Sequence, residues 1–167
     1  RRDNLPAPLT SFIGREREIA AVVALLGTTR LLTVIGPGGS GKTRLALAAA
    51  DRLAGELAGG AWFVPLSAVE DAALVPSAVA TALSIEEEVG RPLGETLRSS
   101  LQGRELLLVL DNMEQVIAAA GFVADLLSAV RGLRVLATSR EVLRVAGEQE
   151  YRVPPLVGLD AVSLFVD

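Results

Sequence analysis

Along this chain, segments whose aliphatic residues have helical spacing alternate with short apolar runs that are typical of buried strands. The first helical stretch has aliphatic residues at i, i+3, i+4 and i+7, namely Ile19, Val22, Val23 and Leu26. Residues 31–35 form a short β-leaning run that stops at a glycine-rich stretch, and residues 45–53 return to helical spacing. This order predicts a strand, a loop and a second helix after the first helix.

The same two patterns continue towards the end of the chain. Further strands are predicted over 61–66, 106–110, 133–137 and, more weakly, 151–153, and further helices over 75–83, 93–101 and 116–130. The run 106–110 is aliphatic at every position, which predicts a strand covered on both faces, as in a parallel sheet between helices. Strands that alternate with helices predict an α/β fold whose ligands bind beyond the carboxyl ends of the strands. The acidic triplet 86–88 predicts a solvated loop.

Residues 36–43 read G-P-G-G-S-G-K-T and match the phosphate-binding pattern G-x-x-x-x-G-K-[ST] between a predicted strand and a predicted helix. Glycines there let backbone N–H groups surround phosphate oxygens, and the following helix presents its positive end to them. Lys42 is expected to reach the β- and γ-phosphates, and the Thr43 hydroxyl to bind Mg²⁺. A turn that only joins strand to helix is the alternative, but Lys42 is the single lysine of the chain. The predicted nucleotide-binding residues of this stretch are Gly36, Gly38, Gly39, Ser40, Gly41, Lys42, Thr43 and Arg44.

The aliphatic strand 106–110 ends in Asp111, the pattern of a carboxylate that holds Mg²⁺ beside the phosphate loop. Asp111 and Thr43 are therefore the predicted metal ligands. The next residue is Asn112, in the position where a hydrolysing relative places Glu or Asp as general base, and an amide cannot accept the proton. Glu114 is the nearest substitute carboxylate, although it fits equally well as a solvated residue in the first turn of a helix.

Arg140 follows the strand 133–137 and is predicted to lie near the phosphates, since the carboxyl ends of parallel strands meet at one edge of a sheet. A guanidinium can bind phosphate oxygens through two hydrogen bonds, which makes Arg140 a candidate sensor of the γ-phosphate. The alternative is a surface arginine paired with Glu141 or Glu148. The predicted catalytic residues are Lys42, Asp111, Asn112 and Arg140.

Composition narrows the range of functions. The net charge is −4 and the only basic doublet is at residues 1–2, which argues against direct nucleic-acid binding by this chain. Because the chain has no Cys and no His, thiolate or imidazole metal sites, Ser-His-Asp triads and disulfide frameworks are excluded. The longest apolar runs are far shorter than the roughly 20 residues of a membrane helix, so no membrane partner is expected. The lack of cysteine leaves the compartment open, and a cytoplasmic location is expected as the simpler alternative.

Four segments in this order, 11–16, 36–43, 108–112 and 137–141, resemble the nucleotide-binding domain of STAND-class P-loop NTPases. More specifically, the chain is similar to the NB-ARC-like (AP-ATPase-like) module of large bacterial transcriptional regulators of the SARP and LuxR type. The resemblance implies a three-layer P-loop NTPase sandwich with a parallel sheet in strand order 2-3-4-1-5. It also implies adenine contacts from Ile13 and Arg15, magnesium binding by Asp111 and a terminal-phosphate contact from Arg140.

The resemblance further implies a molecular switch with ATP or ADP and Mg²⁺ as ligands. ADP would hold a closed, autoinhibited form, whereas an inducer and ATP would favour an open form that assembles or activates the DNA-binding part. Helical, winged-helix and DNA-binding domains of the same protein would be its partners, with self-association in the ATP form. Residues 1–167 are expected to be this domain cut before its helical subdomain, because no Gly-Leu-Pro-Leu segment is reached.

Two other functions also use a phosphate loop. A small P-loop kinase acting on a metabolite needs an acceptor pocket and an arginine-bearing lid, and the sequence has no lid-like insertion with clustered arginines. An oligomeric mechanical ATPase of the AAA type needs a strong base after Asp111 and an arginine finger from a neighbour. Asn112 counts against that function and predicts slow hydrolysis.

Overall fold

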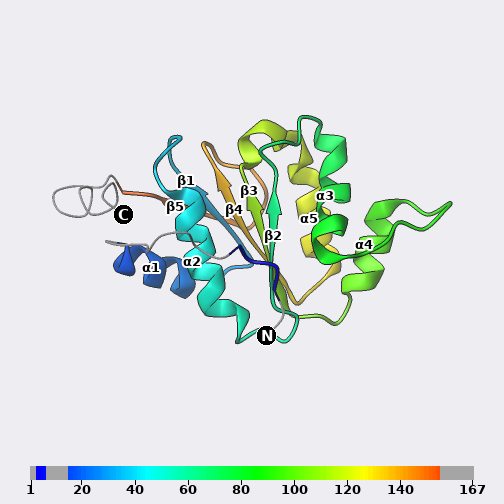
Figure 1. Ribbon diagram of the computed structural model, residues 1–167, viewed down its shortest axis with the longest axis horizontal. Helices are drawn as coiled ribbons and strands as arrows, with labels where there is room; N and C mark the ends of the chain where they lie inside the picture. The colour runs from blue at the N-terminus through cyan, green and yellow to red at the C-terminus, as the bar shows by residue number, and fades with distance from the viewer. Residues whose placement is uncertain (1–2, 7–14, 155–167) are drawn as a thin grey trace.

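The computed structural model describes residues 3–6 and 15–154, and its centre is one sheet of five parallel strands (Figure 1). The strands are β1 (Leu31–Ile35), β2 (Ala61–Pro65), β3 (Leu106–Asp111), β4 (Leu133–Ser139) and β5 (Glu148–Arg152). Their order across the sheet is β2-β3-β4-β1-β5, and every neighbouring pair is parallel. The predicted α/β class, the parallel sheet and the 2-3-4-1-5 order are therefore confirmed.

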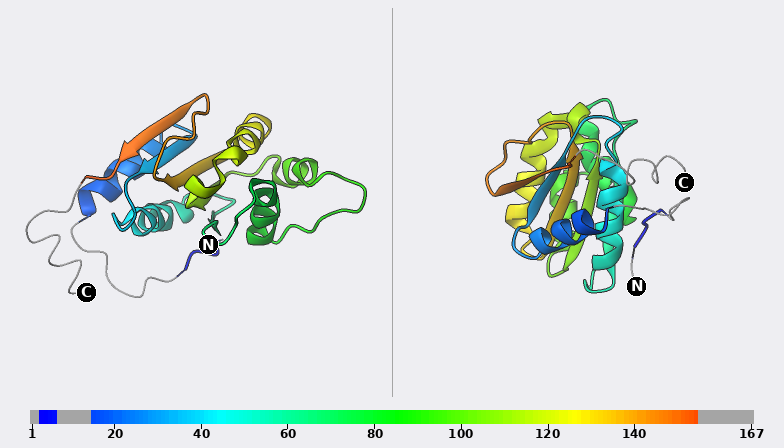
Figure 2. Two further views of the ribbon diagram at one scale, coloured as in Figure 1. Left: turned by 90° about the horizontal axis from the view of Figure 1, so that it is seen from above. Right: turned by 90° about the vertical axis from the view of Figure 1, so that its left-hand side faces the viewer.

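Helices cover both faces of the sheet. They are α1 (Glu16–Leu26), α2 (Lys42–Ala54), α3 (Val75–Leu83), α4 (Leu93–Leu101) and α5 (Ala120–Ala129), with the 3₁₀ helices η1 (Ala72–Leu74) and η2 (Met113–Ala119). The right-hand view of Figure 2 shows the sheet lying between α2 and α5. In the described part of the chain, none of these helices is long and apolar enough to cross a membrane.

Strand β3, which lies between β2 and β4, contributes to two separate cores. Leu106, Leu108 and Leu110 pack with side chains of α3, α4 and α5, whereas Leu107 and Val109 pack with side chains of α1 and α2. Successive side chains of a strand point to opposite faces, so a strand between two helical layers must be apolar at every position. The aliphatic run 106–110 is unbroken because β3 is covered by helices on both faces of the sheet.

Three segments meet at the carboxyl edge of the sheet. Ile35 at the end of β1 lies opposite Ser139 of β4 and Arg152 of β5. Leu110 of β3 lies opposite Ala137 of β4. The phosphate-binding loop after β1, the turn after β3 and the connection after β4 therefore lie at one edge, as the sequence predicts.

The single helix predicted over 116–130 is wrong. The segment folds as η2 followed by α5, and Val116 has non-helical backbone angles (φ −132°, ψ 38°). Val116 and Val123 are both buried on either side of this kink. The apolar spacing therefore continues through the break, and a pattern of burial alone does not distinguish one helix from two.

The strand predicted at 151–153 is displaced, because β5 spans Glu148–Arg152. This strand lies at the edge of the sheet and most of its residues are polar and exposed, so a hydrophobic pattern does not locate its start. The Glu148 carboxylate fixes that start: it accepts the N–H of Leu143 (2.9 Å), the N–H of Arg144 (3.0 Å) and the hydroxyl of Thr33 (2.6 Å).

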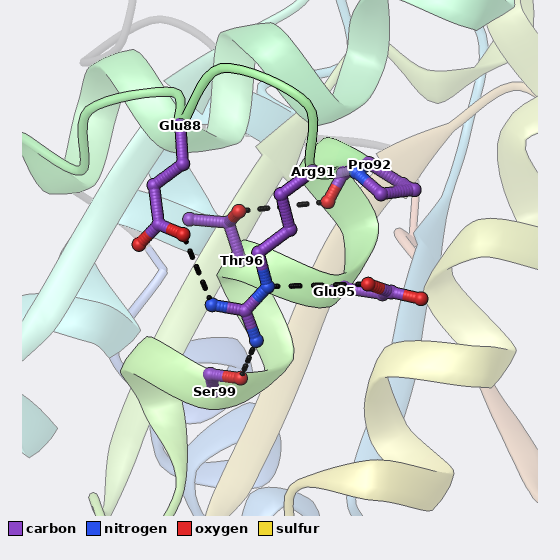
Figure 3. Close-up of polar contacts among 6 residues, drawn as sticks. All are labelled: Glu88, Arg91, Pro92, Glu95, Thr96 and Ser99. Carbon is purple, nitrogen blue, oxygen red and sulfur yellow. Dashed lines mark hydrogen bonds and ion pairs between the residues drawn. The ribbon is translucent and has the colours of Figure 1, made fainter.

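The connection between α3 and α4 extends away from the sheet (Figures 1 and 2). Its base is braced by Arg91, whose guanidinium donates to Glu88 (3.1 Å) and to the Ser99 hydroxyl and lies 3.9 Å from Glu95 (Figure 3). Residues 86–88 are exposed, as predicted for a solvated loop. Because these ion pairs are exposed, they orient the loop more than they stabilise the fold.

A short segment near the N-terminus covers the β2 edge of the sheet. Asp3 forms a parallel bridge to Ala61. The Asn4 carboxamide accepts the N–H of Phe63 (2.6 Å) and donates to the Phe63 carbonyl (3.0 Å). One side chain thereby satisfies the two backbone groups that a further strand would otherwise bind.

Candidate functional site

The phosphate-binding loop, residues 36–43, connects β1 to α2 and is held by backbone contacts. Gly41 has φ +86°, a left-handed conformation that side chains disfavour, and α2 begins directly after it. The Gly36 N–H donates to the Ser139 carbonyl (3.3 Å), and the Ser40 N–H donates to the Pro37 carbonyl (3.2 Å). The loop is thus attached to β4 and folded back on itself at the N-terminus of a helix, a position suited to bind anions.

Lys42 lies in this loop and is only 7% exposed. Its Nζ donates to the Pro37 carbonyl at 2.9 Å. Burial lowers the pKa of Lys42 below its usual value; Glu114 opposes this shift, Arg140 adds to it and Asp111 opposes it. An anion placed in the loop would offset the cost of burying this ammonium group.

Asp111 and Thr43 are brought together at the end of β3. The Thr43 hydroxyl donates to Asp111 Oδ1 at 2.7 Å, and Asp111 is 6% exposed. Mg²⁺ prefers oxygen ligands and is usually held by one or two carboxylates together with substrate phosphates. One carboxylate and one hydroxyl beside a phosphate-binding loop fit that ion, and within the described ranges no group of three or more acidic residues offers another metal site.

Thr138, the second-last residue of β4, orients the same carboxylate. It is fully buried, its hydroxyl donates to Asp111 Oδ1 (2.7 Å), and its oxygen accepts the backbone N–H of Asn112 (2.9 Å). Thr138 therefore fixes both the metal-binding carboxylate and the residue that follows it. Thr138 was not among the predicted site residues; its only signal in the sequence is a hydroxyl at the end of a strand neighbouring β3.

We predict that Thr138→Val destabilises the chain by about 1–3 kcal/mol. The side chain keeps its shape, but the partly buried N–H of Asn112 loses its acceptor and the Asp111 carboxylate loses one donor. The measurement is chemical denaturation followed by circular dichroism. Thr138→Ser, which keeps the hydroxyl, is expected to recover most of the loss. Equal stability of the Val variant and the parent chain would contradict the prediction.

A pocket of about 510 Å³ opens at this edge of the sheet. The residues that line it are Gly38, Gly39, Gly41, Lys42, Thr43, Arg44, Asn112, Glu114, Gln115 and Arg140. Asn112 has a left-handed backbone conformation (φ 66°), and η2 starts immediately after it. This turn brings Glu114 and Gln115 to the pocket together with Asn112. Gln115 was not predicted, because it is recognisable only once the turn is known.

Arg140 lies over the phosphate-binding loop. A Cβ added to Gly38 would come within 2.8 Å of Arg140 Nη2, so the guanidinium occupies the space that a side chain at Gly38 would need. Within the described residues Arg140 forms no ion pair with Glu141 or Glu148, and the Glu148 carboxylate binds other partners. The alternative that Arg140 is a surface arginine paired with Glu141 or Glu148 is therefore wrong for this structure.

The remaining predicted residues lie beside or outside the pocket. Gly36 and Ser40 belong to the loop without lining the pocket. Arg15 is 1% exposed, and its guanidinium donates to the carbonyls of Ser40 and Pro154. Ile13 lies outside the described residues. The adenine contacts assigned to Ile13 and Arg15 stay predictions.

The strand order and the loop between β1 and α2 define a P-loop NTPase fold. A family model described as "AAA ATPase domain" matches residues 11–146, so the chain belongs to the AAA ATPase domain family. The STAND resemblance predicted a P-loop ATPase domain, which this match confirms. The AAA name itself was not predicted, because an AAA-type mechanical ATPase was an alternative that Asn112 counted against. Membership in this family does not by itself tell a switch from a mechanical ATPase.

Two relatives cover most of the chain. An uncharacterized protein of Mycobacterium tuberculosis is 40% identical over 161 residues, which are 95% of this chain and 41% of that protein. A protein of Mycobacterium bovis named "Putative HTH-type transcriptional regulator" is 42% identical over 146 residues, 86% of this chain and 16% of that protein. The chain thus spans less than half the length of these relatives.

Solved structures share the fold at low sequence identity. Cdc6p from Pyrobaculum aerophilum superposes with a TM-score of 0.70 at 15% identity, covering 97% of this chain and 50% of that chain. A STAND protein with a tetratricopeptide repeat sensor from Pyrococcus horikoshii gives a TM-score of 0.63 at 16% identity, covering 96% of this chain and 26% of that chain. The predicted relationship to STAND ATPases and to transcriptional regulators is consistent with this fold and with the relative's name.

Proposed function

We propose that this chain is the ATP- and ADP-binding switch domain of a signal-responsive transcriptional regulator, in which slow ATP hydrolysis separates active from inactive states. The observation that carries the proposal is Arg140 above Gly38 in the phosphate-binding loop. A guanidinium at that point can distinguish a nucleotide with a γ-phosphate from one without it. A switch needs such a difference, because a ligand shifts a two-state equilibrium only through contacts that differ between the states.

The loop and its neighbours supply the binding groups. Backbone N–H groups of the loop and Lys42 would bind the phosphates, and Thr43 with Asp111 would hold Mg²⁺, which neutralises phosphate charge when bound. Asn112 beside Asp111 would orient a water molecule without accepting its proton, which favours slow hydrolysis. A persistent ATP form gives the rest of the protein time to respond.

The partners follow from the length of the relatives. A chain that corresponds to 16% of a protein named as a transcriptional regulator would act on further domains of a longer protein, DNA-binding ones included. Self-association in the ATP form belongs to the same proposal. With a net charge of −4, this domain itself is not proposed to bind DNA, and a cytoplasmic location stays a prediction.

The test compares two nucleotides on two variants. Arg140→Gln is expected to weaken binding of a non-hydrolysable ATP analogue with Mg²⁺ about tenfold or more, since a charge-assisted contact is lost, and to leave ADP binding nearly unchanged. Isothermal titration calorimetry measures both affinities. Arg144→Gln, an exposed arginine of the same β4–β5 connection, is the matched control and should bind like the parent chain. Equal losses for ADP and the ATP analogue would contradict γ-phosphate sensing.

A further inference from the structure

Arg15 joins three parts of the chain that are distant in sequence. It precedes α1, its Nη1 donates to the Pro154 carbonyl (3.1 Å), and its Nη2 donates to the Ser40 carbonyl (3.2 Å). Ser40 belongs to the phosphate-binding loop, and Pro154 follows β5. A single buried guanidinium therefore connects the loop to the chain that leaves the sheet.

The contact between Arg15 and Ser40 includes two buried polar atoms without a hydrogen-bond partner in the described part of the chain. Arg15 is 1% exposed, and within the described residues it pairs with no carboxylate. In the part of the chain that the structure describes, two buried side-chain polar atoms have no hydrogen-bond partner, Arg15 Nε and Ser40 Oγ. Native structures keep few such atoms, so each needs an explanation. Both belong to the two residues that this contact joins.

The end of β5 is attached to the loop at a second point. The Val153 N–H donates to the Ile35 carbonyl at 2.8 Å. Ile35 is the last residue of β1 and directly precedes the phosphate-binding loop. The backbone at 153–154 thus has two attachments to this region. Val153 is bonded to Ile35, just before the loop, and Pro154 is connected to Ser40, within the loop, through the Arg15 guanidinium. A movement of the Ser40 carbonyl would therefore displace the Arg15 guanidinium and alter its hydrogen bond to the Pro154 carbonyl.

We propose that Arg15 is a positioning residue that couples the phosphate-binding loop to the end of β5, so that nucleotide in the loop changes the environment of the backbone at Pro154. This inference rests on the proposed nucleotide binding. It gives the switch a physical connection from the phosphates to the point where the chain leaves the sheet. It also assigns Arg15 a function that differs from contact with adenine.

The chain contains its own reporter for this coupling. Tyr151 on β5 is the single tyrosine, and it packs partly buried against the core on the α1–α2 side. Burial raises the pKa of Tyr151, Glu18 raises it as well, and Arg15 lowers it, so the phenol lies within the electrostatic reach of Arg15. A fluorine label on tyrosine would give one ¹⁹F resonance that reports on this position alone.

The experiment is ¹⁹F NMR of the chain with 3-fluorotyrosine, titrated with ADP and Mg²⁺. The resonance of the parent chain is expected to shift on binding. Arg15→Met is expected to bind ADP about fivefold more weakly, because the loop loses the contact at Ser40, and to show no shift when saturated. Arg17→Met, which removes an exposed arginine from the first turn of α1, two residues after Arg15, is the matched control and should shift like the parent chain.

The outcomes separate the coupling from the function on which it rests. If calorimetry detects no ADP binding by the parent chain, the proposed function fails. If ADP binds and the parent resonance stays still, or if Arg15→Met keeps the full shift, the coupling is overturned and nucleotide binding stands. If Arg15→Met fails to fold, Arg15→Lys is the second variant, because it keeps the positive charge but can make one of the two carbonyl contacts. A resonance shift smaller than that of the parent chain supports the coupling, and a shift equal to it overturns the coupling.

Discussion

Lys42→Ala is expected to weaken the binding of ATP with Mg²⁺ about tenfold or more. The variant removes a charge-assisted contact to phosphate worth about 1.5–3 kcal/mol, and no other lysine exists in the chain to replace it. The same substitution should not destabilise the empty chain much, because burial lowers the pKa of Lys42 and so disfavours the charged ammonium in the folded state. Affinity and stability are therefore expected to respond differently.

Calorimetric titration gives the affinity, and thermal unfolding without nucleotide gives the stability. Arg52→Ala is the control on the same helix, because it removes a positive charge whose partner is Glu16 on the surface. This control should bind ATP like the parent chain. Equal ATP affinity of Lys42→Ala and the parent would show that the loop is not the nucleotide site.

Asn112→Asp is expected to accelerate a slow hydrolysis reaction. General-base assistance typically contributes 10²–10⁴-fold, and the substitution supplies a carboxylate at a position that lines the pocket. Asn112 has φ 66°, a conformation that Asp tolerates about as well as Asn, so the backbone should not change. An increase of about tenfold or more in the single-turnover rate is the expected result.

Glu114→Gln distinguishes the two candidate carboxylates. Glu114 also lines the pocket, and it is the strongest of the charges that raise the pKa of Lys42. If Asn112 causes slow hydrolysis, Glu114→Gln leaves the rate unchanged. If the parent hydrolyses ATP rapidly and Glu114→Gln abolishes the reaction, Glu114 is the base and the slow switch is wrong. Single-turnover measurements with enzyme in excess separate this step from product release.

The parallel sheet and the phosphate-binding loop could be predicted because each depends on a short, continuous stretch of sequence. An aliphatic run such as 106–110 has one common explanation, a strand between two layers of helices. The loop pattern requires glycines and a lysine at fixed spacing, and the strand and helix on its two sides lie where the pattern requires them. The strand order followed from the family resemblance rather than from any local pattern.

Contacts between distant segments could not be predicted in this way. Thr138 is one hydroxyl at a strand end, and its importance depends on β4 lying beside β3 in a particular register. Arg15 was assigned to adenine through the resemblance, whereas its two carbonyl partners lie 25 and 139 residues away. The kink at Val116 is likewise invisible, since both sides of it bury apolar residues.

Asn4 has a consequence for how this domain can be shortened or fused to other proteins. A domain boundary placed after residue 6 would remove the carboxamide that binds both backbone groups of Phe63. The β2 edge would then offer a free N–H and a free carbonyl to strands of other molecules, the usual start of edge-to-edge aggregation. Biosensors or chimaeric regulators made from this domain should therefore begin no later than Asp3.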